Sequence, residues 1–281
     1  MGGAWQTNAP LPVARTEVAA ATYGDEIAVV GGFLADGGNS THVDLYSPVS
    51  DTWRRAPDLP TGVNHAAAAV ARGQLYVLGG YGAPRSAFRL DGNEWKTFAL
   101  PAQRAAAGAA ALRGTIYIAG GVGRSGNARS MLAYDTRAHR WRTLPGPTPR
   151  QHLAVTAVRG RIYAIAGRVT GLNTNFRLVE SWAPGEKRWR REAPVPQARG
   201  GTGAAAVGST IVSVGGEAPS GTVRTVYAYD VRVRRWRRLA DLPTPRHGLG
   251  VVAYGRKVYV IGGGTAPGLA VSSANESLAI R

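Results

Sequence analysis

The sequence predicts an all-β fold, a closed six-bladed β-propeller, on three observations. Six segments end in a β-rich run followed by a pair of glycines or its near equivalent, and a tryptophan recurs in step with them. Short strand-like runs, separated by Gly, Pro, Asn and Asp, fill each repeat, four in the complete ones. A repeat of about 47 residues indicates one architecture built from similar units, not a set of unrelated domains.

The glycine pairs mark the end of one strand in every repeat. They fall at Gly31 and Gly32, Gly79 and Gly80, Gly120 and Gly121, Ala166 and Gly167, Gly215 and Gly216, and Gly262 and Gly263. Only the fourth repeat departs from the pattern, with Ala166 in the first position. Glycine inside a strand pattern often marks a close approach of another backbone, so we expect these pairs where inner strands crowd together.

The tryptophans supply the second periodic signal. They occur at Trp5, Trp53, Trp95, Trp141, Trp189 and Trp236, with spacings of 48, 42, 46, 48 and 47 residues. A tyrosine precedes the tryptophan in three repeats, at Tyr46, Tyr134 and Tyr229, and Trp182 takes its place in the fourth. Large aromatic side chains bury much apolar area, so we expect them to pack between neighbouring blades.

Paired glycines followed by Tyr and then Trp, repeated six times in register, resemble the Kelch repeat over essentially the whole chain. The resemblance implies a propeller of four-stranded antiparallel blades. We expect one domain over 1–281, with blades at about 15–57, 63–99, 104–145, 150–193, 199–240 and 246–281. The sixth repeat lacks its Trp strand, so residues 3–7 around Trp5 should complete it, which removes the open sheet edges.

Composition restricts the chemistry and leaves one charge question open. The 281 residues contain no cysteine, which excludes disulfides, thiolate metal sites and a Cys nucleophile. The formal charge is +17, and all basic residues except Lys96, Lys187 and Lys257 are arginine. This charge indicates either an anion-binding surface or solvated arginines that reflect codon usage. No apolar run long enough to span a membrane and no leader peptide is visible, the compartment stays open, and a monomer is expected.

A register counted from the glycine pairs predicts the candidate site. Let strands a to d run from the axis outward; the d–a and b–c connections then share one face, at the mouth of the axial channel. Sixteen residues before the first glycine of each pair lie Arg15, Val63, Arg104, Arg150, Arg199 and Arg246. Two residues further on, on the same side of a regular strand, lie Glu17, His65, Ala106, His152, Gly201 and Gly248. The b–c loops add Arg85, Arg124, Arg129 and Arg168.

These positions predict a non-catalytic scaffold that binds an acidic peptide or another anionic ligand. The predicted ligand-binding residues are Arg15, Glu17, His65, Arg104, Arg150, His152, Arg199 and Arg246. Arginine suits this role because its guanidinium pairs with a carboxylate through two hydrogen bonds. The alternative is that the five arginines only brace neighbouring loops through backbone carbonyls, since a Pro-Arg segment leading into strand a is typical of Kelch repeats.

Other partners and cofactors are expected to be absent. His65, His152 and His247 could in principle hold a metal, but their blades are not adjacent, so no metal and no cofactor is predicted. The arginines that flank the tryptophans, such as Arg54, Arg140 and Arg235, belong to outermost strands, where they protect edges or attract nucleic acid only nonspecifically.

One enzymatic alternative remains open. Bacterial six-bladed Kelch proteins include a sialic-acid mutarotase that relies on arginine and glutamate, so the resemblance implies a carbohydrate-acting propeller, an isomerase or a lectin, as the second interpretation. Arg15 with Glu17, or Glu217 beside the ring, would supply an arginine for the sugar carboxylate and a carboxylate for proton transfer. The copper oxidases among Kelch-type propellers need a Cys–Tyr pair, which this sequence cannot form.

Overall fold

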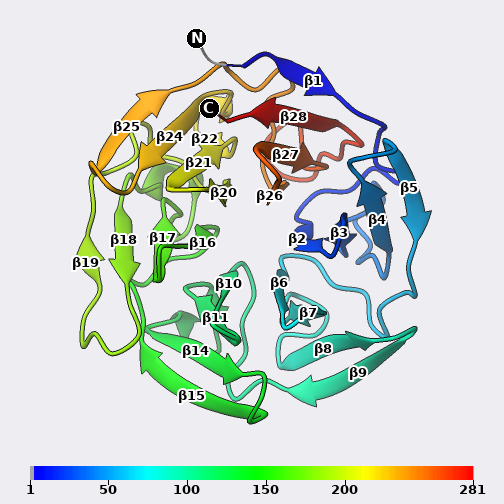
Figure 1. The fold of residues 1–281 in the computed structure, drawn as a ribbon, viewed down its shortest axis with the longest axis vertical. Coiled ribbons are helices and arrows are strands. Elements are labelled where there is room, and N and C mark those ends of the chain that lie inside the picture. Colours follow the sequence, from blue (N-terminus) through cyan, green and yellow to red (C-terminus); the bar gives the residue numbers. More distant parts are fainter. Residues whose placement is uncertain (1–2, 281) are drawn as a thin grey trace.

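Six four-stranded antiparallel sheets surround a central axis in the computed structural model, which describes residues 3–280 (Figure 1). The predicted six-bladed propeller is therefore confirmed. Blades 1 and 2 comprise β2 (Ala19–Tyr23), β3 (Glu26–Val30), β4 (Val43–Ser47), β5 (Thr52–Arg55), β6 (Ala67–Ala71), β7 (Gln74–Leu78), β8 (Ser86–Asp91) and β9 (Glu94–Ala99). Blades 3 and 4 comprise β10 (Gly108–Leu112), β11 (Thr115–Ala119), β14 (Ser130–Asp135), β15 (Arg140–Pro145), β16 (Ala154–Val158), β17 (Arg161–Ile165), β18 (Val179–Trp182) and β19 (Arg190–Arg191).

The last two blades include the one strand that comes from the beginning of the chain. They comprise β20 (Gly203–Val207), β21 (Thr210–Val214), β24 (Val226–Asp230), β25 (Arg235–Arg238), β26 (Gly250–Tyr254), β27 (Lys257–Ile261), β28 (Asn275–Ala279) and β1 (Trp5–Thr7). β1 pairs antiparallel with β28, with Trp5 opposite Leu278, and forms the outermost strand of the sixth sheet. The outer edge of β28 is covered in this way by main-chain pairing with the N-terminal segment.

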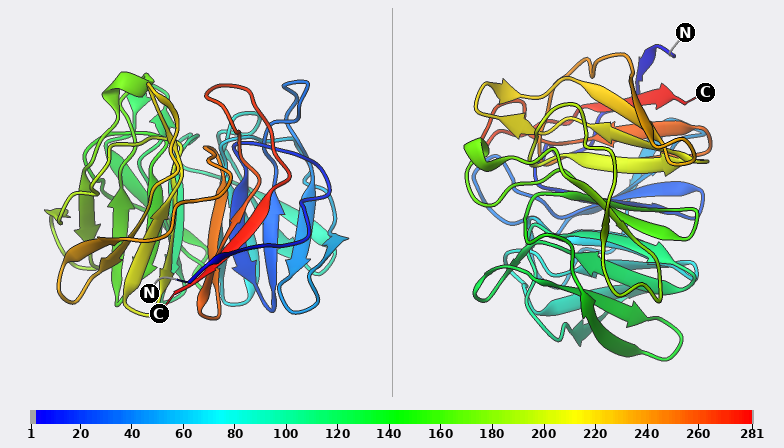
Figure 2. Two further views of the ribbon diagram at one scale, coloured as in Figure 1. Left: turned by 90° about the horizontal axis from the view of Figure 1, so that it is seen from above. Right: turned by 90° about the vertical axis from the view of Figure 1, so that its left-hand side faces the viewer.

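Two short hairpins and one helical turn lie in the b–c loops. They are β12 (Val122–Gly123) with β13 (Gly126–Asn127), β22 (Glu217–Ala218) with β23 (Gly221–Thr222), and the 3-10 turn η1 (Leu172–Thr174). Figure 2 shows η1 on the face opposite both ends of the chain. No helix among residues 3–280 is long and apolar enough to cross a membrane.

The inner strands are built from small residues because six of them must fit around one axis. β2, β6, β10 and β20 are mostly alanine and glycine, and each inner strand contacts the inner strands of both neighbouring blades. A cavity of about 370 Å³ runs between these strands and is lined largely by alanine. Larger side chains would push the blades apart, since interiors are close-packed and tolerate added volume poorly.

The tryptophans join neighbouring blades as well as filling space. The indole nitrogen of Trp53 donates a hydrogen bond of 2.9 Å to the Ala9 carbonyl, and that of Trp95 donates one of 2.9 Å to the Pro57 carbonyl. Within a blade, the Tyr46 and Trp53 rings lie 5.0 Å apart. Each such tryptophan therefore anchors an outer strand to the connection that leaves the preceding blade, which gives a structural role to the predicted aromatic repeat.

Candidate functional site at the mouth of the axial channel

A ring of backbone hydrogen bonds closes around the axis at the face that carries the b–c loops. One residue from each blade takes part, and each has a positive φ between 51° and 60°. In blades 2 to 6, the peptide N–H of this residue donates to the carbonyl of its counterpart in the preceding blade at 2.9–3.0 Å. In blade 1, the N–H of Val18 donates to the Gly248 carbonyl at 3.1 Å and closes the ring. The six residues are Glu17, His65, Ala106, His152, Gly201 and Gly248.

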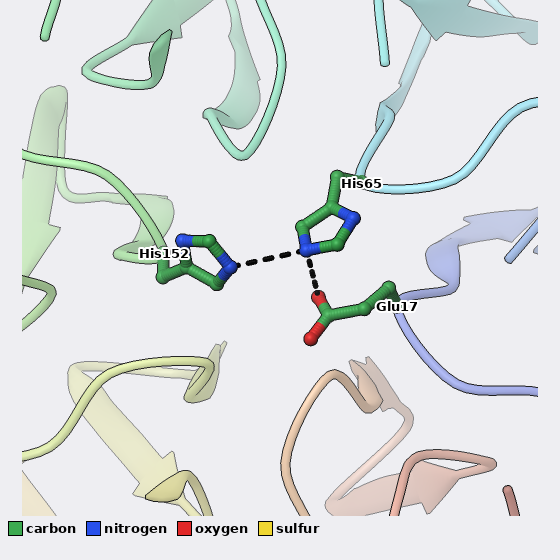
Figure 3. A group of neighbouring side chains, drawn as sticks. All are labelled: Glu17, His65 and His152. Carbon is green, nitrogen blue, oxygen red and sulfur yellow. Dashed lines mark hydrogen bonds and ion pairs between the residues drawn. The ribbon is translucent and has the colours of Figure 1, made fainter. Parts of the chain in front are cut away.

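The left-handed backbone at these six positions explains where their side chains go. Glycine tolerates positive φ at no cost, whereas a non-glycine residue there is uncommon and needs support from its surroundings. Three positions are filled by Ala106, Gly201 and Gly248, which leave the axis open. The other three positions are Glu17, His65 and His152, whose carboxylate and imidazole groups meet across the axis (Figure 3).

Glu17, His65 and His152 form the centre of a charged network. His65 Nε2 lies 3.0 Å from His152 Nε2 and 3.3 Å from Glu17 Oε2. The other carboxylate oxygen of Glu17 lies 3.2 Å from His247 Nδ1. The network continues from His247 to Glu217 at 3.8 Å and ends in the 2.5 Å ion pair between Glu217 and Arg168.

The hydrogen-bond partners assign the protons of His247. Its Nε2 lies 3.0 Å from the Ala266 carbonyl, which can only accept, so this nitrogen carries a proton. Its Nδ1 faces the carboxylates of Glu17 and Glu217 and needs a proton as well. Burial alone would lower the pKa of His247, but the hydrogen bond and charge of Glu17, with the charge of Glu217, raise it. His247 is therefore an imidazolium between two carboxylates.

The pKa values of His65 and His152 are shifted in the opposite direction from that of His247. Burial lowers the pKa of His65 and that of His152, the latter to about 3, although the charge of Glu17 works against the shift in both. Both imidazoles are neutral near pH 7. Burial also disfavours the Glu17 carboxylate, whereas the hydrogen bond and positive charge of His247 favour it and act to lower the pKa of Glu17.

A pocket opens above this network toward solvent. It has a volume of about 370 Å³, and its floor is formed by Glu17, His65, His152, Glu217 and His247. Phe33 and Leu269 contribute apolar walls. A small molecule or a few residues of a peptide would fit a pocket of this size.

The predicted arginine ring does not line this opening. Arg15, Arg150, Arg199 and Arg246 are fully buried and Arg104 nearly so. The guanidinium of Arg150 contacts Glu180 at 2.5 Å and donates to the carbonyls of Ala166 and Ala164 at 2.7 and 3.0 Å. The prediction that the five arginines form an anion-binding mouth is therefore wrong, and the alternative, bracing through carbonyls, describes Arg15, Arg104, Arg150, Arg199 and Arg246.

The physical reason for this correction lies between the arginine and the inner strand. The period of two that we applied to residues 15 and 17 holds only in a regular strand, and β2 begins at Ala19. The positive φ of Glu17 turns the chain, so Arg15 points into its own blade, where it pairs with Asp44, while Glu17 points to the axis. Arg15 and Glu17 therefore do not act together, and the predicted sugar-acid pair built on them is wrong.

The sequence carries a signal for this bracing in three blades. Asp44, Glu180 and Glu276 occupy the second position of strand c in blades 1, 4 and 6, and each pairs with the arginine of its own blade. Blade 2 has neither partner, because Val63 replaces the arginine and Ala87 stands in strand c. In these three blades the arginine and the acid lie about 30 residues apart, which indicates an ion pair within the blade. Blades 3 and 5 keep the arginine but have Met131 and Tyr227 at the equivalent position of strand c.

Exposed arginines do occur on this face, further from the axis. They lie in equivalent places at the end of the b–c loop in four consecutive blades. Each carbonyl accepts a backbone hydrogen bond from the following connection, at 2.8–3.2 Å. All four side chains are exposed. This arginine arc consists of Arg85, Arg129, Arg177 and Arg224.

Few acidic groups neutralise the arginine arc. Within residues 3–280, Arg85 and Arg129 have no recorded ion pair or side-chain hydrogen bond, and Arg177 donates only to the Val195 carbonyl. Arg224 lies 3.5 Å from Asp241. Three of the exposed large apolar side chains, Tyr81, Val169 and Leu269, are 40–56% exposed on the b–c loops of the same face. The face therefore combines free positive charge with exposed apolar groups.

Comparison with known proteins agrees with the repeat pattern. The model of the KLHDC2/KLHL20/DRC7 Kelch-repeats domain matches residues 17–191, and the Kelch motif matches residues 198–243. Kelch-like protein terF of Aspergillus terreus is 41% identical over 70 residues, which are 24% of this chain and 15% of the relative. Kelch-like protein 35 of Mus musculus is 34% identical over 76 residues, 27% of this chain and 12% of the relative.

The matched segments thus span less than a sixth of these relatives, while one solved structure matches the whole fold. That structure, described as "Structure of YjhT", has a TM-score of 0.81 and 17% sequence identity, and the match covers 94% of this chain and 95% of that chain. At this identity the likeness concerns the fold alone. Because a family model matches more than half of its residues, the chain belongs to the Kelch-repeat family.

Proposed function

We propose that this propeller is a non-catalytic binding module that holds an acidic polypeptide segment across the channel mouth. The observation that carries the proposal is the arginine arc, four exposed guanidinium groups in register on one face with a single carboxylate near one of them. The formal charge of +17 adds a long-range field that favours an acidic partner. Protein binding is also the general role of Kelch-repeat propellers.

The apolar side chains of the same face indicate which residues, besides acidic ones, the bound peptide segment should contain. Phe33 and Leu269 line the pocket, and Tyr81 and Val169 are exposed on other b–c loops of the same face. A segment that alternates acidic with aliphatic or aromatic residues would pair with the arginine arc and cover these groups. Burying such exposed apolar area contributes affinity, while the charges contribute orientation and specificity.

Removing the arginine arc should weaken binding without affecting the fold. We expect a peptide selected from a displayed random library on the immobilised propeller to be rich in Asp and Glu. The triple variant Arg85→Ala, Arg129→Ala and Arg177→Ala should bind it about tenfold more weakly, since each exposed ion pair contributes about 0.2–1 kcal/mol. The dissociation constant is measured by fluorescence anisotropy with the labelled peptide.

A control variant with the same net charge distinguishes the effect of the arginine arc from the effect of the protein's total charge. Arg140, Arg142 and Arg235 are exposed on outer strands, and their triple alanine variant loses the same three charges. It should retain nearly the wild-type affinity. At about 1 M salt, where the Debye length is about 3 Å, the difference between the arc variant and wild type should largely vanish. Selected peptides without acidic residues, or equal losses in both triple variants, would contradict the proposal.

A further inference from the structure

Glu17, His65 and His152 lie together on the axis, and the proposed peptide binding does not explain why these three side chains converge. One atom from each side chain lies within 4.8 Å of the others, at the bottom of the mouth pocket (Figure 3). Because the three residues come from blades 1, 2 and 4, only the radial arrangement of the propeller brings them together. The chemistry of this group follows from where its protons are.

The proton of His152 is assigned by a backbone carbonyl. The amide nitrogen of Gln151 donates to the Val169 carbonyl at 3.0 Å, and since that carbonyl can only accept, the amide orientation of Gln151 is fixed. Its oxygen then faces His152 Nδ1 at 3.0 Å, so Nδ1 carries the proton. His152 Nε2 is left with a lone pair that points toward His65 and Glu17.

An amide side chain also contacts Nδ1 of His65, although here its partner is a second amide and not a backbone carbonyl. Asn64 donates through its amide nitrogen to Asn39 Oδ1, and its oxygen lies 2.5 Å from His65 Nδ1. With the Asn64 oxygen facing Nδ1, His65 Nε2 is unprotonated, which is the form of the imidazole that can bind a metal ion. Edge contacts hold the ring on two sides, with ring centroids 5.7 Å from Phe33 and 5.3 Å from Tyr81. In this tautomer, two imidazole lone pairs and a carboxylate oxygen face one another with no proton between them.

Such a set of acceptors is repulsive by itself and favourable around a cation. Neutral imidazole nitrogens and carboxylate oxygens are the ligands that zinc takes in proteins, at about 2.0–2.2 Å. Tetrahedral geometry at those bond lengths places ligand atoms about 3.4 Å apart. The observed separations of 3.0 Å between the two nitrogens and 3.3 Å between nitrogen and oxygen are close to that value.

We propose that His65 Nε2, His152 Nε2 and a Glu17 oxygen bind one divalent transition-metal ion, with Zn²⁺ the best fit. This inference does not depend on the proposed peptide binding. The outer shell matches metal sites in general, where each ligating imidazole donates its other N–H to an oxygen and the carboxylate is itself hydrogen-bonded. Asn64 and Gln151 supply those oxygens, and His247 holds Glu17.

The fourth coordination position would face the mouth pocket. Ala106, Gly201 and Gly248 occupy the remaining ring positions and offer no ligand atoms. Three protein ligands with one open position are typical of zinc sites that bind water or an exogenous ligand. The ion would also replace repulsion on the axis by attraction, and thereby stabilise the contact between blades 1, 2 and 4.

Metal binding is tested on the whole chain, stripped with a chelator and titrated with Zn²⁺ in a calorimeter. We expect one Zn²⁺ per chain and a higher melting temperature with the metal. His65→Ala and His152→Ala should each lose more than the roughly 10–100-fold affinity that typically follows removal of an outer-shell partner, and Gln151→Ala should lose that smaller factor. Alanine is suitable here because Ala106 already occupies the equivalent position with positive φ.

Two further measurements keep the test decisive. His139→Ala removes an imidazole that contacts Tyr134 in blade 3, away from the axis, and should leave zinc affinity unchanged. In the unmutated protein, nitrogen NMR of the imidazoles should show Nδ1–H tautomers for His65 and His152, with Nε2 shifted by the metal. No tight binding, binding unaffected by His65→Ala and His152→Ala, or equal loss in His139→Ala would overturn the proposal.

Discussion

Replacing Arg150 by alanine should lower the free energy of unfolding by about 3–5 kcal/mol, a large part of the stability of an ordinary domain. The guanidinium is fully buried and satisfies the Glu180 carboxylate and the carbonyls of Ala164 and Ala166. Without it, Glu180 remains buried as an unpaired charge and the carbonyls lose their donor. Chemical denaturation followed by tryptophan fluorescence measures the loss.

Two control variants distinguish this role from surface charge. Arg140 is exposed on β15, and Arg140→Ala should change stability by no more than about 0.5 kcal/mol. Arg104 has no carboxylate partner among residues 3–280 and donates to the carbonyls of Gln103 and Ser130, so Arg104→Ala should cost less than Arg150→Ala. An Arg150→Ala protein as stable as wild type would show that the buried pair does not hold the blade.

Introducing alanine at Gly79 should destabilise the propeller by about 2–5 kcal/mol. The residue has a φ of +63°, and an added Cβ would lie 2.2 Å from the Arg104 carbonyl oxygen of the next blade. That oxygen accepts a 2.8 Å hydrogen bond from Gly80, so moving it away would break a contact between blades. Thermal and chemical unfolding of the variant measure the effect.

A second glycine variant separates the steric contribution to this loss of stability from the contribution of backbone strain. Gly73, in the turn between β6 and β7, has a φ of +75° with no atom within 4 Å of an added Cβ. Gly73→Ala carries only the backbone strain, about 1–2 kcal/mol. The difference between the two variants is the price of the clash, and equal effects at Gly73 and Gly79 would show that close approach of the blades is unimportant.

Much of the fold could be predicted because its signals are local and repeated. Each glycine pair, tyrosine and tryptophan has the same neighbours in every blade, so six weak matches in register support one another. Gly79 is required both for its positive φ and for the close approach of Arg104, and the sequence pattern predicts only the close approach of another backbone. Local patterns of this kind are set by short-range sterics, which sequence periodicity reports well.

The candidate site was predicted only in part. Glu17, His65 and His152 do lie at the channel mouth, whereas the arginine that precedes each ring position in five blades is buried in its own blade. His247, one residue away from the ring register, still reaches Glu17. The sequence predicts Arg85 and Arg129 in b–c loops, but only the shared backbone hydrogen bonds show that they are equivalent to Arg177 and Arg224.

The sequence alone determined the number of blades, the order of strands and the small inner residues, because these depend on repeats within about 47 residues. Tertiary structure alone decided which side chains share the axis. The positive φ of Glu17 directs the Arg15 side chain into its own blade and the Glu17 carboxylate to the channel mouth. His65 and His152 contact each other although they are 87 positions apart in the sequence. Radial closure sets such contacts, and no local pattern encodes the direction in which a side chain leaves a left-handed turn.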